Sequence, residues 1–156
     1  MGKKPLIPVI LATGFGSGFS PFAPGTAGAL LATVIWMGYT LVLPPSICVV
    51  LTIILTLLFT FVGIWATNKV IPFWGEDPHQ VVVDEMVGVW IPLIAAPAGN
   101  IWYALASFVL FRFFDIAKPL GVRQMERLPG GIGVMADDIL AGIYSLLIII
   151  CAQWIL

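Results

Sequence analysis

The sequence predicts an all-α protein, a polytopic membrane helix bundle of about five spans built as one domain over residues 1–156. The first indication is composition: 60% of the residues are hydrophobic and 10% are charged, against about 45–50% and 25% in soluble globular proteins. The second is the distribution of charge, because uncharged runs of 64, 26 and 18 residues follow the first, second and third charged clusters. A charge at a bilayer centre costs roughly 2.5–3.5 kcal/mol on insertion scales, so the uncharged runs are candidate spans.

The two longer runs must be divided, because a membrane helix needs about 20 residues. Pro44 and Pro45 divide the first run, since proline removes a backbone donor. A turn at residues 97–100 (Pro-Ala-Gly-Asn) divides the second. The predicted spans are Ala27–Leu43, Ile47–Ala66, Glu85–Ala96, Ile101–Ala117 and Ile139–Leu156. The third is short, so it either begins before its acids or is sheltered by protein.

Leu6–Phe22, near the N-terminus, is too rich in glycine and serine to be a span. Its apolar part is too short to cross a bilayer. We interpret it as an interfacial or re-entrant segment, because irregular backbone at membrane depth needs protein or water to satisfy it.

The orientation follows from lysine and arginine, which occur in alternate connections and favour a cytoplasmic N-terminus. We therefore expect a protein integral to the cytoplasmic (inner) membrane, with all its charged groups at the cytoplasmic face. The net charge of −1 argues against a nucleic-acid partner.

Two adjacent acid pairs are predicted to begin helices: Asp84 and Glu85 in the third span, Asp137 and Asp138 in the fifth. Acids at a helix start can simply cap it. One acid would suffice for that, however, and like charges held together need a cation or a proton. Converging carboxylates favour a hard cation, Mg²⁺ or Mn²⁺.

Small residues follow each acid pair by about one helical turn, at Gly88, Ala141 and Gly142. They would let the two helices approach closely, although glycine is common in membrane helices in any case.

Arg112, Asp115 and Lys118 are spaced by three and share one helix face. They form either a local ion-pair ladder or two cations for an anionic substrate beside one carboxylate. The uncharged loop at 17–28 adds amides at a helix start, which bind anions, and hydroxyls. Ser17, Ser20 and Thr26 are therefore candidate phosphate contacts.

Four stretches together resemble the phosphatidylglycerophosphatase A family. They are residues 14–28 (GFGSGFSPFAPGTAG), 81–88 (VVVDEMVG), 111–119 (FRFFDIAKP) and 130–142 (GGIGVMADDILAG). The resemblance implies a membrane phosphatase that requires Mg²⁺ and converts phosphatidylglycerophosphate to phosphatidylglycerol, with membrane lipid as its surroundings. Asp77 also matches an acid of the family's loop.

Resemblance and residue chemistry together define the expected site. The expected Mg²⁺ ligands are Asp84, Glu85, Asp137 and Asp138. The expected catalytic residues are Asp84, Asp115, Lys118, Asp137 and Asp138. The expected substrate contacts are Ser17, Ser20, Thr26, Arg112 and Lys118.

The alternative function is a small ion or substrate transporter that uses the clustered carboxylates. A carrier places its site near the membrane midplane, whereas here the acids are predicted at span ends. A regulatory membrane subunit is a third alternative, but it would not need paired acids beside phosphate-binding cations.

Overall fold

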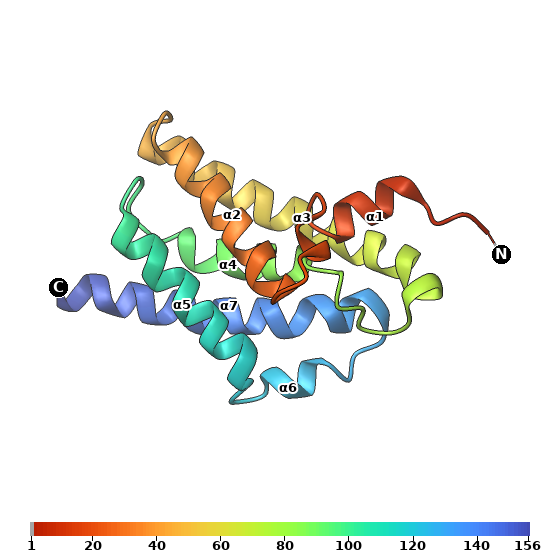
Figure 1. The fold of residues 1–156 in the computed structure, drawn as a ribbon. Helices are drawn as coiled ribbons and strands as arrows, with labels where there is room; N and C mark the ends of the chain where they lie inside the picture. Colours follow the sequence, from red (N-terminus) through yellow and green to blue (C-terminus); the bar gives the residue numbers. More distant parts are fainter. Residues whose placement is uncertain (1) are drawn as a thin grey trace.

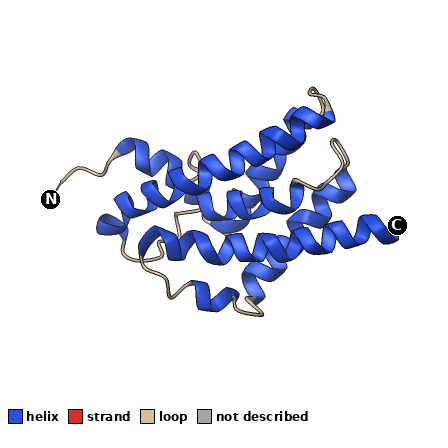
Figure 2. Ribbon diagram, turned by 180° about the vertical axis from the view of Figure 1, so that it is seen from behind, coloured by secondary structure: helices blue, strands red, loops and turns tan. Residues whose placement is uncertain are grey.

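A computed structural model describes residues 2–156, which form seven α-helices and one short 3₁₀ helix without a strand (Figures 1 and 2). The all-α class is therefore confirmed. The helices are α1 (Leu6–Ala12), η1 (Ser17–Phe19), α2 (Pro24–Thr40), α3 (Pro45–Trp74), α4 (Val83–Leu93), α5 (Ile101–Ala117), α6 (Val122–Met125) and α7 (Gly130–Ile155).

Five of these helices form a bundle in which the chain runs back and forth. The α2–α3 and α4–α5 connections lie at the same end as the C-terminus, on the left of Figure 1, whereas the N-terminus lies at the other end. The central helix is α4, which contacts α2, α3, α5 and α7. The starts of α2, α4 and α7 and the ends of α3 and α5 therefore face the same side of the molecule.

Helix α4 corresponds to the short third span. It begins at Val83, one residue before Asp84, and nearly all of its 11 residues are buried. At 1.5 Å per residue it is about 16 Å long, well short of the ~30 Å hydrocarbon core. Both suggestions made for this segment hold: it begins just before its acids and it is sheltered by the surrounding helices.

Two helices are longer than predicted. Helix α3 continues beyond Ala66 to Trp74 and has 30 residues, and α7 begins at Gly130 rather than Ile139 and has 26. The predicted boundaries were wrong because they were placed where the apolar residues end. A helix can continue past that point into polar surroundings. The glycine-rich start of α7 docks on α3, where the Gly131 amide donates to Asn68 Oδ1 at 2.7 Å.

Only α3 and α7 in the described chain are long and apolar enough to qualify individually as membrane spans. Helices α2 and α5 have 17 residues each. Five spans therefore remain a prediction.

The outside of the bundle supports membrane association. On α5, a stripe of large apolar side chains at helical spacing is exposed: Ile101, Leu105, Val109, Phe113 and Ile116. A soluble monomer rarely exposes so continuous an apolar face, whereas lipid would cover it.

Helices α4 and α7 pack closely at two glycines. A Cβ on Gly142 would lie 2.5 Å from the Gly88 carbonyl oxygen, and a Cβ on Gly88 would lie 2.2 Å from Phe111 Cε2. The prediction that small residues allow close approach here is confirmed. This contact brings the acids of α4 and α7 together.

The N-terminal segment folds onto the loop before α4. The Val82 amide donates to the Ala12 carbonyl at 2.9 Å, and Gly18 packs so closely on the Gln80 carbonyl that a Cβ would overlap it. Leu6 and Ile7 of α1 are exposed. The placement of Leu6–Phe22 at a membrane surface stays a prediction.

Candidate active site

A pocket of about 380 Å³ opens where α2, α4, α5 and α7 meet. Seven carboxylates, one lysine and one arginine line it. Their formal charge is −5 when the histidine in the lining is neutral. These residues are Asp77, Asp84, Glu85, Arg112, Asp115, Lys118, Glu126, Asp137 and Asp138. Every predicted metal ligand and every predicted catalytic residue is among them.

The two acid pairs reach the pocket in different ways. Asp84 and Glu85 lie in the first turn of α4. Asp137 and Asp138 do not open a helix, as the sequence had indicated, but lie about two turns inside α7. Capping therefore cannot explain the second pair. Burial adds to the cost of these charges, because Asp84, Asp137 and Asp138 are only 8%, 6% and 1% exposed.

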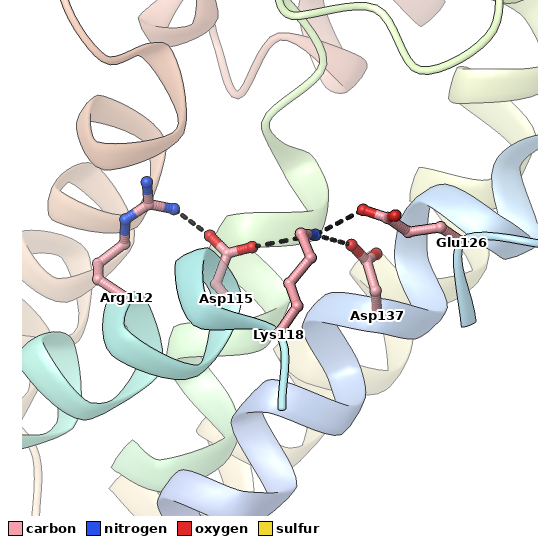
Figure 3. Close-up of polar contacts among 5 residues, drawn as sticks. All are labelled: Arg112, Asp115, Lys118, Glu126 and Asp137. Atoms are coloured by element: carbon pink, nitrogen blue, oxygen red, sulfur yellow. Dashed lines mark hydrogen bonds and ion pairs between the residues drawn. The ribbon is translucent and has the colours of Figure 1, made fainter. Parts of the chain in front are cut away.

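Four ion pairs involve the two basic side chains (Figure 3). Arg112 pairs with Asp115. Lys118 Nζ lies 2.6 Å from Asp137 Oδ2, 2.8 Å from Glu126 Oε1 and 3.8 Å from Asp115 Oδ1. The local ladder along α5 is thus present, but Lys118 also joins α5 to α7 and to the loop between them.

Lys118 is held as a cation. Burial alone would lower its pKa, but hydrogen bonds to Asp137 and Glu126 outweigh that effect and raise the pKa above its usual range. The residue has a left-handed backbone (φ +49°) directly after α5 and before Pro119. This turn ends the helix and directs the ammonium group into the pocket (Figure 3).

Several carboxylate oxygens in the pocket have no hydrogen-bond partner. They are Asp84 Oδ1, Glu85 Oε2, Asp137 Oδ1 and Asp138 Oδ2, all fully shielded from solvent. Buried polar atoms are almost always paired in native proteins, so these oxygens require a partner. Hard cations prefer oxygen ligands, and the donor set therefore fits a hard cation.

Three predicted substrate contacts do not line the pocket. The hydroxyl of Ser17 donates to the Gly14 carbonyl at 2.8 Å, and that of Ser20 donates to the Phe22 carbonyl at 2.8 Å. These serines stabilise their own loop. Thr26 is also absent from the lining, which instead includes Pro24 and Gly25 of α2 and Ala23 directly before that helix.

Sequence reasoning missed Glu126 and Gly25. Glu126 pairs with Lys118 across a loop. Helical spacing cannot predict such a contact. Gly25 packs on the site so tightly that a Cβ would lie 2.4 Å from Glu85 Oε1. The sequence showed only one more glycine in a glycine-rich stretch. The exposed side chain of His79 also lines the pocket.

Three known proteins are similar to this chain along most of its length. A protein of Bacteroides thetaiotaomicron is 58% identical over 158 residues (100% of this chain, 99% of the relative) and carries the provisional name phosphatidylinositol-3-phosphatase. Phosphatidylglycerophosphatase A of Haemophilus influenzae is 40% identical over 147 residues (93% of this chain, 88% of the relative). The Escherichia coli enzyme of that name is 37% identical over 146 residues (87% and 77%).

No solved structure matches the chain. The family model for phosphatidylglycerophosphatase A matches residues 10–153, which include every charged residue that lines the pocket. The match covers most of the chain and agrees with the two phosphatidylglycerophosphatases among the relatives. The chain belongs to the phosphatidylglycerophosphatase A family.

Proposed function

We propose that this protein is a Mg²⁺-dependent lipid phosphatase that hydrolyses phosphatidylglycerophosphate to phosphatidylglycerol and inorganic phosphate. Its place is the cytoplasmic membrane, with the pocket facing the cytoplasm. Family membership supports the reaction. The lysines and arginines at the pocket end of the bundle support the orientation.

The observation that carries this proposal is the convergence of acids and bases from three helices on one pocket. Asp84 and Glu85 come from α4, Arg112 and Asp115 from α5, and Asp137 and Asp138 from α7. A phosphate monoester bound at headgroup depth would meet this end of the bundle.

The charge of the pocket supports a metal requirement. A phosphate monoester carries about −1.5 to −2 charges at neutral pH, and a pocket of formal charge −5 would repel it. We assign Asp84, Glu85, Asp137 and Asp138 as the residues that would hold Mg²⁺. The chemistry that Mg²⁺ supplies when bound is positive charge at the phosphoryl oxygens and a lower pKa for coordinated water.

The side chains of the chain have separate roles in this proposal. Arg112 and Lys118 bind phosphate oxygens and stabilise the negative charge that develops on them. A carboxylate oxygen of Asp84, Asp137 or Asp138 that does not bind the metal accepts a proton from the attacking water. The water oxygen forms a bond to phosphorus and the bond from phosphorus to the headgroup oxygen breaks. The protonated aspartate then returns its proton to that headgroup oxygen.

The direct test is phosphate release by the purified protein in detergent. We expect release from phosphatidylglycerophosphate with Mg²⁺ and none with a chelator. Asp138→Asn should lower kcat by about 10²- to 10⁴-fold if its carboxylate is a catalytic base. Glu76→Gln, at an exposed acid outside this pocket, is the control. Normal turnover by Asp138→Asn would contradict the assignment of this residue.

A second substrate has a specific observation in its favour, because the relative that is 58% identical is provisionally named a phosphatidylinositol-3-phosphatase. Phosphatidylinositol 3-phosphate should therefore be assayed in parallel, with phosphatidic and lysophosphatidic acids. The lipid with the highest kcat/KM identifies the substrate. No release from any lipid by the folded protein would refute the phosphatase proposal and favour the transporter alternative.

A further inference from the structure

We propose that the pocket contains two cation sites that fill in order. The first, formed by Asp84, Glu85 and Asp138, binds its ion before the substrate arrives. The second, formed by Asp115, Asp137 and Asp138, is blocked by Arg112 and Lys118 until a phosphate monoester draws these side chains away. This inference rests on the proposed function, and it adds Asp115 as a ligand and a coupling between ion and substrate.

Two overlapping groups of carboxylates support the pair of sites. In each group the three residues offer oxygens that all lie within 4.8 Å of one another, and Asp138 belongs to both. Asp138 is 1% exposed, and its Oδ2 is shielded from solvent without a hydrogen-bond partner. The shared residue is thus a buried oxygen ligand in the pocket lining that has no partner.

The two groups differ in the charge that already neutralises them. In the second group, Asp115 pairs with Arg112 and Asp137 pairs with Lys118. Within residues 2–156, none of the ion pairs involves Asp84, Glu85 or Asp138. Like charges held close require compensation, so the first group has the greater need for a resident cation.

Substrate binding would change the second group. Arg112 and Lys118 are the residues assigned to the phosphate, and their side chains are 17% and 21% exposed, against 10% and 9% for Asp115 and Asp137. The basic side chains are thus more accessible than the carboxylates with which they pair. When they turn to phosphate oxygens, Asp115 and Asp137 lose their partners, and a second cation can replace them.

The ordering has a thermodynamic consequence. If a phosphate monoester releases the second site, the ion and the monoester must tighten each other's binding by the same factor. Couplings of this kind are typically about 5- to 150-fold. We therefore expect binding of the second ion to depend steeply on the anion, and binding of the first to be nearly independent of it.

The experiment counts Mn²⁺ bound per chain, using the electron paramagnetic resonance signal of free Mn²⁺ with purified protein in detergent. Methylphosphonate serves as a phosphate monoester analogue that cannot be hydrolysed. The wild-type protein should bind one Mn²⁺ tightly alone. With methylphosphonate it should bind two, the second about tenfold more tightly than without.

Four variants separate the sites. Asp84→Asn should lose the tight ion. Asp115→Asn should keep it but bind no second ion with methylphosphonate. Lys118→Met should bind the second ion more tightly than the wild type does without the analogue, because one of the two blocking cations is gone. Arg123→Met, which removes an exposed cation outside the pocket, should behave like the wild type. Circular dichroism in the same detergent verifies folding. If a variant does not fold, the number of Mn²⁺ ions bound by the wild-type protein with and without methylphosphonate still tests the inference.

Several results would overturn the inference. A single Mn²⁺ with and without methylphosphonate would show one site, and two equal ions in both conditions would show that the basic residues block nothing. Loss of the tightly bound ion in Asp115→Asn would show that we have assigned the wrong residues to the two sites. None of these results would contradict a Mg²⁺-dependent phosphatase. Phosphate release that persists with a chelator would remove the metal from the proposed function itself.

Discussion

At the scale of single residues, the site depends on how far each carboxylate is already neutralised. Asp115 and Asp137 share the charge of Arg112 and Lys118, whereas Asp84 and Asp138 have buried oxygens without a partner. The sequence indicated which residue types gather here. Their partners depend on contacts between helices that are far apart in the chain.

Glu126 illustrates such a contact and gives a test. Its side chain is 42% exposed and pairs with Lys118 at 2.8 Å. An exposed pair contributes about 0–1 kcal/mol, so Glu126→Gln should fold normally. It should also lower KM for the lipid by up to about fivefold, because the phosphate no longer competes with this carboxylate.

Initial-rate kinetics and thermal unfolding measure these two effects. Glu76→Gln serves as the control for long-range charge, since Glu76 lies in a neighbouring cavity and makes no ion pair in the described chain. A higher KM in Glu126→Gln would mean that Glu126 orients Lys118 instead of competing with the substrate.

At the scale of elements, the glycine contact between α4 and α7 determines where the acids meet. Gly142 packs on the Gly88 carbonyl, and Asp84 and Asp138 each lie four residues before one of these glycines, one turn away on the same helix face. The sequence predicted this contact because the spacing is local to each helix. It could not predict where α7 begins, since Gly130 and Gly131 are held by Asn68 of α3.

Gly142→Ala should therefore destabilise the protein. The new Cβ would lie 2.5 Å from backbone, which cannot move as a side chain can, and overpacking of this kind costs about 1–3 kcal/mol. For a protein of this size each kcal/mol lowers Tm by about 2–4 °C. Thermal unfolding in detergent measures the shift.

Gly38→Ala is the matched control, because it is also a glycine within a helix and a Cβ there would meet nothing within 4 Å. It should leave Tm unchanged or raise it slightly, since alanine favours a helix over glycine. Equal Tm values for Gly142→Ala and the wild type would show that the two helices are not closely packed.

At the scale of the whole molecule, the bundle has an apolar outside and a charged pocket at one end. Val42 lies in the α2–α3 connection and Arg123 in α6, and both are exposed. If the bundle spans the membrane, these two positions face opposite compartments. Single cysteines placed there, with Cys48 and Cys151 replaced by alanine, can be tested with a charged maleimide.

The charged maleimide cannot cross a bilayer, so each cysteine should react from one side only. In inside-out membrane vesicles we expect Arg123→Cys to be labelled and Val42→Cys to be protected, with the reverse in right-side-out vesicles. Labelling of both cysteines from the same side would contradict the spanning topology, and the reverse pattern would contradict a cytoplasmic site.

The sequence by itself determined the helical class, the uncharged segments and most of the acids and bases that line the pocket, because composition and short-range spacing depend only on the order of residues along the chain. Only the tertiary structure decided that α4 is a buried central helix, that Asp137 and Asp138 lie inside α7, and that Ser17 and Ser20 serve their own loop. The physical reason is that helix ends, burial and ion partners depend on neighbours distant in sequence. For Lys118, one such neighbour is Asp137, which lies 19 residues further along the chain.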